Sequence, residues 1–214
     1  IFKFETKLIL RISGHPKLNL IRKFFWKFCS KNIHLITCPS IELKNKLRKL
    51  NIFENKKIVV LYDSVINIKE VNDQKNDLLS GEIRKSNYLL AIGRLTKQKN
   101  FDLLINAFYR FHKINNNYKL LIIGEGEEKK KIISRINQLK LEHKIILLGF
   151  KQNVYKYLKN SKAFILSSLW EEMGFVIIEA ASCNTLIISS NCPNGPSEFL
   201  NNGEAGYLFN NNSV

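Results

Sequence analysis

The segment that decides the fold runs from Tyr88 to Phe111 and reads YLLAIGRLTKQKNFDLLINAFYRF. Its first five residues are uncharged and apolar, as in a strand buried on both faces, and a polar loop follows at 93–99. Asn100 can cap a helix, and the residues after it are apolar at helical spacing: Phe101, Leu104, Ile105, Phe108 and Phe111. A buried strand leading into an amphipathic helix is the basic unit of a parallel α/β sheet.

The same alternation continues towards the end of the chain. Short apolar segments predict strands at 119–123, 145–148, 163–167 and 185–189. Helical patterns lie between them at 127–139, 154–158 and 175–182. The sequence therefore predicts a Rossmann-like domain over residues 88–214, with a parallel sheet covered on both faces.

The first part of the chain has the same pattern in a shorter form. Strands are predicted at 8–12, 33–37 and 58–62, and helices at 16–31 and 40–50. Residues 69–87 are polar and lack a period, which predicts an interdomain linker that can include a short helix. We therefore expect residues 1–68 to be the end of one α/β domain and residues 88–214 to be most of a second. Because the chain begins with Ile1 rather than methionine, we expect a fragment of a longer protein.

Charge is unevenly distributed along the sequence. The chain has 34 basic and 18 acidic residues, a formal net charge of +16, and residues 1–57 contribute 14 basic and 3 acidic side chains, or +11. Such a basic region attracts polyanions, whether nucleic acid, anionic lipid or phosphorylated substrates. No apolar run approaches the roughly 20 residues that a membrane-spanning helix needs. The four cysteines form no Cys-x-x-Cys pair, which argues against a structural metal site.

The basic segment Lys17–Lys31 combines charge with apolar periodicity. One helical face carries Leu18, Ile21, Phe24, Phe25 and Phe28, and the opposite side carries Lys23, Lys27 and Lys31. This pattern is typical of an interfacial helix on an anionic membrane. It also fits a helix packed on the first sheet with its basic face in water, so both interpretations stay open.

Candidate binding residues follow the predicted strands. Arg94 and Lys99 lie in the loop at the carboxyl end of a strand, where α/β sheets bind ligands, and could converge on a phosphate. For one such loop alone, solvated cations are the simpler interpretation. The turn 124–126, Gly-Glu-Gly, has two of the three glycines of a dinucleotide fingerprint, but glycine is also common where such turns pack tightly.

The most informative stretch is residues 167–180, which read SSLWEEMGFVIIEA. Glu171 follows a predicted strand, and Glu179 lies in the next helix. The first turn of that helix, residues 174–176, has backbone N–H groups without helical partners, which can bind an anion or sugar oxygens. Two carboxylates beside it suit a ligand rich in hydroxyl groups, whereas simple helix capping is the alternative role of acidic residues there.

In order along the chain, the motifs are Gly-Arg-Leu…Lys-Asn, Gly-Glu-Gly, Leu-Gly-Phe, Ser-Ser-x-x-Glu with a second Glu eight positions on, Gly-Pro-x-Glu and Gly-Tyr-Leu. This arrangement resembles glycosyltransferase family 4 (glycosyl transferases group 1). Those enzymes are retaining transferases of the GT-B fold, which has two Rossmann-like domains. The resemblance is strong over residues 88–209 and looser over 8–63. It implies an α/β protein of GT-B type whose first, acceptor-binding domain is incomplete and whose C-terminal end is missing.

The resemblance also implies roles for individual residues. Arg94 and Lys99 would hold the diphosphate of a nucleotide-sugar and Glu171 the transferred sugar, which makes these three the catalytic candidates. Glu179 would bind the ribose. The remaining donor-site residues would be Gly93, Gly124, Gly149, Phe150, Asn153, Val154, Gly174, Phe175 and Val176. His15 is a candidate for the histidine that the family often places in the acceptor domain.

The implied reaction transfers a sugar from a nucleotide-sugar, with UDP as the expected nucleotide, to a saccharide or lipid-linked acceptor in cell-surface glycan or lipopolysaccharide synthesis. The fixed cations would stabilise the leaving diphosphate. No Asp-x-Asp motif occurs, so we expect neither a metal nor another cofactor.

We expect a cytoplasmic protein, peripheral on the inner face of the cell membrane. The alternatives are a GT-B epimerase or phosphorylase, or a basic nucleic-acid-binding protein. A nucleic-acid partner is not expected, because no basic-aromatic binding module appears.

Overall fold

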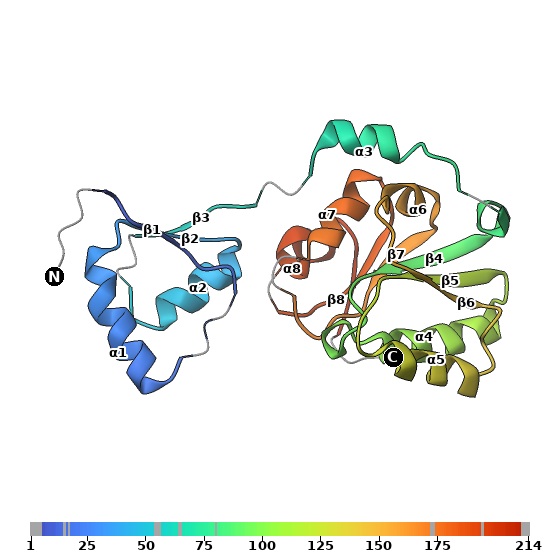
Figure 1. Ribbon diagram of the computed structural model, residues 1–214, viewed down its shortest axis with the longest axis horizontal. Helices are drawn as coiled ribbons and strands as arrows, with labels where there is room; N and C mark the ends of the chain where they lie inside the picture. The colour runs from blue at the N-terminus through green and yellow to red at the C-terminus, as the bar shows by residue number, and fades with distance from the viewer. Residues whose placement is uncertain are drawn as a thin grey trace. The chain divides into compact units, whose positions relative to one another are not determined.

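The computed structural model describes residues 6–14, 16, 18–53, 57–63, 66–79, 81–171, 174–193 and 195–210. The chain divides into two compact units, Ile1–Ser64 and Val65–Val214, which we call the first and second units (Figure 1). Both consist of parallel strands joined by helices, as the sequence predicts. Within the described residues, no helix is both long and apolar enough to cross a bilayer.

The first unit is a three-stranded parallel sheet in the order β1-β2-β3. Its elements are β1 (Ile9–Arg11), α1 (Leu20–Cys29), η1 (Ser30–Asn32), β2 (Leu35–Cys38), α2 (Ile41–Lys49) and β3 (Ile58–Val60). Because both crossovers move the chain in the same direction across the sheet, their helices share one face, as Figure 1 shows. Ser40 caps α2, its hydroxyl accepting a hydrogen bond from the Leu43 amide at 3.1 Å, and α2 turns Leu43 and Leu47 into the core.

Helix α1 differs from α2 because none of its residues is buried. The side chain that packs on the core is Trp26, whose ring centroid lies 5.6 Å from that of Phe53. The other apolar side chains of α1, which are Leu20, Ile21, Phe24, Phe25 and Phe28, are exposed among the described residues. The helix also begins at Leu20 rather than at residue 16, because Asn19 caps it by accepting a hydrogen bond from the Arg22 amide at 2.8 Å.

The second unit contains a six-stranded parallel sheet in the order β6-β5-β4-β7-β8-β9. Its strands are β4 (Asn87–Ile92), β5 (Tyr118–Ile123), β6 (Ile145–Gly149), β7 (Ala163–Leu166), β8 (Ile187–Ser190) and β9 (Tyr207–Phe209). The chain starts at β4, adds β5 and β6 on one side, and then returns to add β7, β8 and β9 on the other. This is the strand order of a doubly wound Rossmann sheet, and its direction reverses between β4 and β7.

Helices cover both faces of this sheet. Figure 1 shows α4 (Phe101–Ile114) and α5 (Lys129–Gln138) on one face, and α6 (Tyr155–Asn160) and α7 (Phe175–Ser182) on the other. Strand β5 contributes side chains to the apolar clusters on both faces of the sheet: Leu120 and Ile122 belong to one cluster and Leu121 to the other. The uninterrupted apolar runs of the central strands follow from this two-sided burial. Shorter elements complete the unit: α3 (Ile68–Gln74), η3 (Gly81–Lys85), η4 (Lys97–Lys99), α8 (Pro196–Phe199) and η5 (Asn201–Gly203).

Residues 69–87, which we expected to be a linker, contain α3 and η3 and contribute to the second unit. Val71 and Leu79 are buried in its core. The Asn153 side-chain amide donates to the Gln74 carbonyl at 2.9 Å and to Asp77 Oδ2 at 2.8 Å, which ties the end of α3 to the start of α6. Val71 and Leu79 are too far apart in the sequence to form a recognisable hydrophobic period, so only the tertiary structure reveals that they are buried.

Candidate functional site

The reversal of strand order places two loops side by side. Residues 93–100 leave the carboxyl end of β4, residues 167–174 leave that of β7, and these two strands pair directly. In open α/β sheets, ligands bind outside the carboxyl ends of the strands at this switch point. The two loops also contain the candidate residues Arg94, Lys99 and Glu171. The topology therefore brings them to the place where a ligand is expected.

An ion pair connects the two loops. Lys99 Nζ lies 2.6 Å from Glu171 Oε1, and their side chains are only 14% and 6% exposed. The Ser168 hydroxyl donates a hydrogen bond to the same carboxylate oxygen. A buried carboxylate requires such partners, because burying an unpaired charge is costly. The pair thus holds a cation and an anion in fixed positions at the switch point.

Further hydrogen bonds hold the loop after β4 against the loop after β7. The Leu169 amide donates to the Gln98 carbonyl at 2.8 Å, and the Gln98 side chain donates to the Trp170 carbonyl at 2.8 Å. The Ser167 hydroxyl donates to the Lys99 carbonyl at 2.8 Å. Both ends of the Lys99–Glu171 pair are therefore anchored through backbone atoms, which makes the site rigid before any ligand binds.

The loop after β8 joins the same network. The Ser190 hydroxyl donates to the Ser168 carbonyl at 2.6 Å, and the Glu171 amide donates to the Pro193 carbonyl at 3.1 Å. The sequence alone indicated no role for Gln98, Ser168 or Ser190. The signal for Ser168 was the Ser-Ser pair three residues before the glutamate. Gln98 and Ser190 have no local pattern that distinguishes them from other polar loop residues.

Glycines allow the strand ends of β4, β5 and β6 to approach one another closely. The Gly93 amide donates to the Ile123 carbonyl and the Gly124 amide to the Gly149 carbonyl, both at 3.0 Å. A Cβ atom on Gly124 would lie 1.9 Å from the Gly93 carbonyl oxygen, and its φ of +145° belongs to glycine. Tight packing accounts for the glycine at position 124, which was the simpler of the two interpretations of this turn.

Glu179 on α7 is a half-buried carboxylate. Burial raises its pKa above the ordinary value for glutamate, and no described residue donates a hydrogen bond to it. Tyr155 on α6 lies close enough that, after burial, the Glu179 charge contributes to raising the tyrosine pKa. A carboxylate that is partly desolvated and lacks a donor is suited to accept hydrogen bonds from hydroxyl groups of a ligand.

The raised pKa of Glu179 predicts a pH-dependent stability. The folded chain retains this proton to a higher pH than the unfolded chain, so the free energy of unfolding should fall as pH rises through that interval. Glu179→Gln should therefore unfold at higher urea concentration than the parent protein at neutral pH. The difference should vanish below the ordinary carboxyl pKa. Urea titrations at a series of pH values check this, and a variant less stable than the parent at neutral pH would contradict it.

The sequence of this chain also matches that of a known protein family. The model of the family described as Glycosyl transferases group 1 matches residues 72–214, which is more than half of the chain. The chain belongs to this family. The match covers most of the second unit, including every site residue described above.

Individual members of the family match over almost the whole chain. An uncharacterized glycosyltransferase of Methanocaldococcus jannaschii is 34% identical, over 94% of this chain and 52% of its own length. The N-acetylgalactosamine-N,N'-diacetylbacillosaminyl-diphospho-undecaprenol 4-alpha-N-acetylgalactosaminyltransferase of Campylobacter jejuni is 28% identical, over 100% of this chain and 60% of its own length. The chain thus spans little more than half of these relatives.

A solved structure supports the fold. The crystal structure of HepE from Anabaena in complex with UDP aligns with a TM-score of 0.80 and 16% identity, covering 97% of this chain and 59% of that one. Together with the parallel sheets of both units, this likeness identifies the fold as α/β of the GT-B type. The fold class expected from the sequence is therefore confirmed.

The residues of the family motifs differ in whether their side chains are exposed and free of hydrogen-bond partners. Arg94 is exposed beside Lys99 in the same loop, and its guanidinium has no hydrogen-bond or ion-pair partner in the described part of the chain. Asn100 occupies the N-cap position of α4, but its left-handed backbone, with φ of 51°, leaves its side chain without the expected capping bond. Arg94 is thus available to a ligand.

The start of α7 is shaped by Gly174, which takes a left-handed conformation with φ of +63° at the N-cap. Phe175 is exposed and Val176 packs against the core. Among the described residues no side chain caps this helix, so its first-turn amides lack the partner that a capping residue would supply. That the first turn of α7 binds an anion or sugar oxygens stays a prediction.

The residues expected near a nucleotide base differ in exposure: some are open to solvent, and others pack in the core or are already hydrogen-bonded. Gly149 ends β6, and Phe150 after it is highly exposed. Val154 packs against the core, and the Asn153 amide is already engaged by α3 as described above. His15 lies outside the described residues. No group of three potential metal ligands occurs in the parts of the chain that the structure describes.

Proposed function

We propose that this chain is the catalytic part of a retaining glycosyltransferase, with the second unit binding a nucleotide-sugar and the first unit forming the end of the acceptor-binding domain. The observation that carries the proposal is the Lys99–Glu171 pair at the switch point, with Arg94 exposed in the same loop. Family membership supports the same reaction class. Neither an epimerase nor a nucleic-acid-binding protein is supported by the relatives.

The chemistry requires opposite charges at two places. The glycosyl–phosphate bond breaks, so negative charge develops on the leaving diphosphate and positive charge on the sugar. Lys99 and Arg94 stabilise the first, and fixed donors are most effective there because they need no reorganisation. The acceptor hydroxyl oxygen forms the new bond on the face that the diphosphate leaves, and its proton passes to a phosphate oxygen of the departing group.

The two carboxylates then have separate tasks. Glu171 has one oxygen occupied by Lys99 and Ser168, so its other oxygen is the one we assign to a sugar hydroxyl. Glu179, which lacks a donor among the described residues, accepts from the ribose hydroxyls. The first-turn amides of α7 contact the sugar or a phosphate. Gly93 and Gly124 allow the strand ends that carry these groups to approach each other closely.

For substrates, we propose UDP as the nucleotide and a saccharide or lipid-linked acceptor, with the protein peripheral on the inner face of the cell membrane. The structure of HepE was solved with UDP, which supports the nucleotide. The name of the Campylobacter jejuni relative specifies a diphospho-undecaprenol-linked acceptor, which supports a lipid-linked one. The product would belong to a cell-surface glycan or a lipopolysaccharide.

Calorimetric titration with UDP, UDP-sugars and GDP-sugars tests the donor site. Arg94→Ala and Glu179→Ala should each weaken UDP binding by about 10- to 100-fold, which is the usual effect of losing a hydrogen bond to a charged group. Lys97→Ala, which removes an exposed cation from the same loop, should bind UDP like the parent protein. If neither Arg94→Ala nor Glu179→Ala weakens binding, the site assignment is wrong. RNA binding that resists salt, without nucleotide binding, would favour the nucleic-acid alternative.

A further inference from the structure

Ser168 is a buried serine beside the Lys99–Glu171 pair, and the proposed function leaves it without a role. The residue is 0% exposed, and its hydroxyl donates to Glu171 Oε1, the oxygen that also contacts Lys99 Nζ. A buried hydroxyl group needs a hydrogen-bond partner, and here the partner is the residue assigned to the transferred sugar. Any effect of Ser168 on a ligand therefore passes through Glu171.

The contacts of one carboxylate oxygen of Glu171 decide where the other oxygen lies. A glutamate side chain is flexible, so a single partner would leave the carboxylate free to turn about that contact. Lys99 reaches Oε1 from the loop after β4, and Ser168 reaches the same oxygen from the loop after β7. No described residue donates to Oε2. Two donors on one oxygen thus fix the direction in which the other can accept a hydrogen bond.

Ser190 holds the backbone of Ser168. It ends β8, is 0% exposed, and its hydroxyl donates to the Ser168 carbonyl at 2.6 Å. The last paired residues of β7 and β8 are Leu166 and Ser189, so this side-chain contact continues the pairing of the two strands beyond the end of their ladder. The position of Ser168 is therefore set by the sheet, which is more rigid than a loop.

The Cys192 thiol lies close to the same groups and adds no charge to them. The residue is 3% exposed, and burial raises the pKa of its thiol to about 11. The Glu171 charge raises this pKa further, whereas the Lys99 charge and a hydrogen bond with Ser190 lower it. Because the thiol stays protonated at neutral pH, it does not repel the Glu171 carboxylate.

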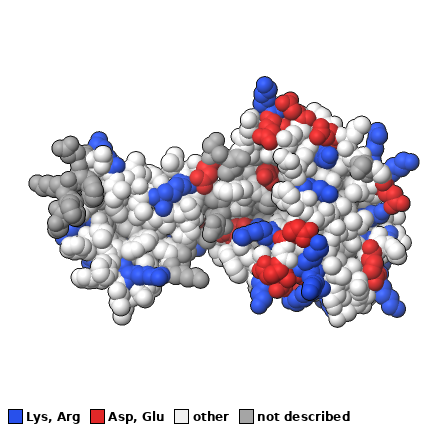
Figure 2. Space-filling model, in the orientation of Figure 1, with Lys and Arg blue, Asp and Glu red and all other residues white. Residues whose placement is uncertain are grey.

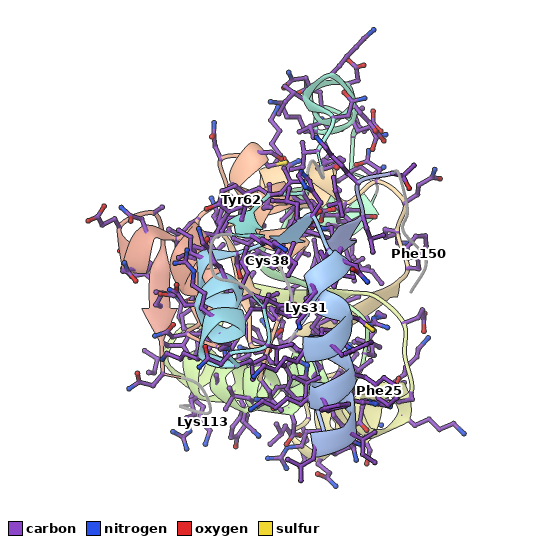
Figure 3. All side chains as sticks on the ribbon, turned by 90° about the vertical axis from the view of Figure 1, so that its left-hand side faces the viewer. Phe25, Lys31, Cys38, Tyr62, Lys113 and Phe150 are labelled. Carbon is purple, nitrogen blue, oxygen red and sulfur yellow. The ribbon has the colours of Figure 1, made fainter. Side chains whose placement is uncertain are left out.

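Charges on the surface of the second unit are arranged differently. Figure 2 shows basic and acidic side chains mixed on the visible face of this unit, as is usual for solvated charges. Lys113, labelled in Figure 3, is an exposed lysine of α4, and its ammonium lies 4.3 Å from the centroid of the Tyr109 ring. Water competes with exposed contacts of this kind, so they fix little geometry. The Glu171 carboxylate is instead enclosed and held by a buried serine.

We propose that Ser168 and Ser190 are positioning residues for recognition of the transferred sugar. Ser168 holds the Glu171 carboxylate so that Oε2 accepts from a sugar hydroxyl, and Ser190 holds Ser168 in place. Neither serine touches the ligand. The inference rests on the proposed function and deepens it, because it assigns recognition of the sugar, as distinct from the nucleotide, to a chain of buried groups that starts on β8.

Ser168 has a task that Lys99 cannot perform alone. The ammonium of Lys99 has several N–H donors, and the proposed reaction directs some of them to the diphosphate. A lysine that turns towards phosphate oxygens relaxes its hold on Glu171. The Ser168 hydroxyl gives the carboxylate a second donor that stays in place during this change. A sugar hydroxyl that donates to a fixed, ionised oxygen forms a charge-assisted hydrogen bond, which is stronger than a neutral one.

The test compares UDP with UDP-glucose, UDP-galactose and their N-acetylated forms in calorimetric titrations. Ser168→Ala should weaken binding of the UDP-sugar that the parent protein prefers by about tenfold, and leave UDP binding within about twofold of the parental value. Ser190→Ala should weaken UDP-sugar binding by about threefold, because the Ser168 hydroxyl remains. A serine with only a structural role would change both dissociation constants together, so equal losses for UDP and UDP-sugar overturn the proposal.

A double-mutant cycle shows whether Ser168 acts through Glu171. In the background of Glu171→Gln the carboxylate is absent, so adding Ser168→Ala should weaken UDP-sugar binding by no more than about twofold. Losses that multiply independently in the double variant contradict the proposal. Ser168→Thr keeps the hydroxyl and should retain the parental preference, although its extra methyl group lowers the urea midpoint.

Ser189→Ala is the matched control. Ser189 is also 0% exposed, and its hydroxyl donates to the Ser190 carbonyl at 3.0 Å. This variant should lose stability in urea and still bind UDP and UDP-sugars like the parent protein. A loss of UDP-sugar binding equal to that of Ser168→Ala overturns the proposal.

The same titrations separate failure of this inference from failure of the donor site. If Arg94→Ala weakens UDP binding but Ser168→Ala leaves UDP-sugar binding unchanged, the positioning role is wrong and the donor site stands. If the parent protein binds neither UDP nor any of the UDP-sugars, the proposed function fails and the positioning role fails with it.

Discussion

Replacing Lys99 with alanine is expected to lower turnover by about 10²- to 10³-fold, the usual effect of removing one fixed donor from a developing negative charge. Lys99 is the cation that the topology fixes at the switch point, because Glu171 holds its ammonium and Ser167 holds its backbone carbonyl. The measurement is UDP release from the UDP-sugar that calorimetry identifies. The neighbouring variant Lys97→Ala should retain parental turnover. A loss smaller than tenfold in Lys99→Ala would contradict the role assigned to this lysine.

The same substitution should also destabilise the protein, for a separate reason. Without Lys99, the Glu171 carboxylate remains buried with only Ser168 as a side-chain donor among the described residues, and breaking a buried pair in this way costs about 3–5 kcal/mol. Adding Glu171→Gln removes the unpaired charge, so the double variant should recover part of the stability of the parent protein. It should not recover turnover. Urea unfolding and UDP release, measured on the parent protein and the two variants, therefore separate the structural role of the pair from its catalytic one.

A second large loss of stability is expected from Gly124→Ala. The added Cβ would lie 1.9 Å from the Gly93 carbonyl oxygen, and the backbone φ of +145° is unfavourable for alanine. Because the obstacle is backbone rather than a flexible side chain, the strand ends of β4 and β5 would have to separate. We expect the free energy of unfolding to fall by at least ~3 kcal/mol, the sum of backbone strain and overpacking.

Gly203→Ala is the matched control for Gly124→Ala. Gly203 also has a positive φ, +106°, but nothing lies within 4 Å of the position of an added Cβ. This variant should therefore show the cost of backbone strain alone, which is about 1–3 kcal/mol. Urea unfolding of both variants measures the difference. If Gly124→Ala is no less stable than Gly203→Ala, the result contradicts the close approach of the ends of β4 and β5.

Much of the second unit was predictable because its signals are local. Five of its six strands and the helices between them follow from apolar runs and helical periods, and the observed bounds differ by a residue or two at most ends. The linker was less predictable, since Val71 and Leu79 reveal their packing only when α6 and the sheet lie beside them. Helix α1 shows the opposite problem. Its period correctly predicted a helix, but a period does not say which side faces the protein.

The amino-acid sequence by itself determined the elements and the chemical types: parallel strands, helices, and the cations and carboxylates that follow strand ends. It could do so because hydrophobic periodicity and turn residues act within a few positions of one another. Only the tertiary structure decided which of these residues meet. Lys99 and Glu171 are 72 positions apart, and they form a pair because the chain returns past β4 to place β7 next to it. Strand order is set by packing of the whole sheet, which no local segment encodes.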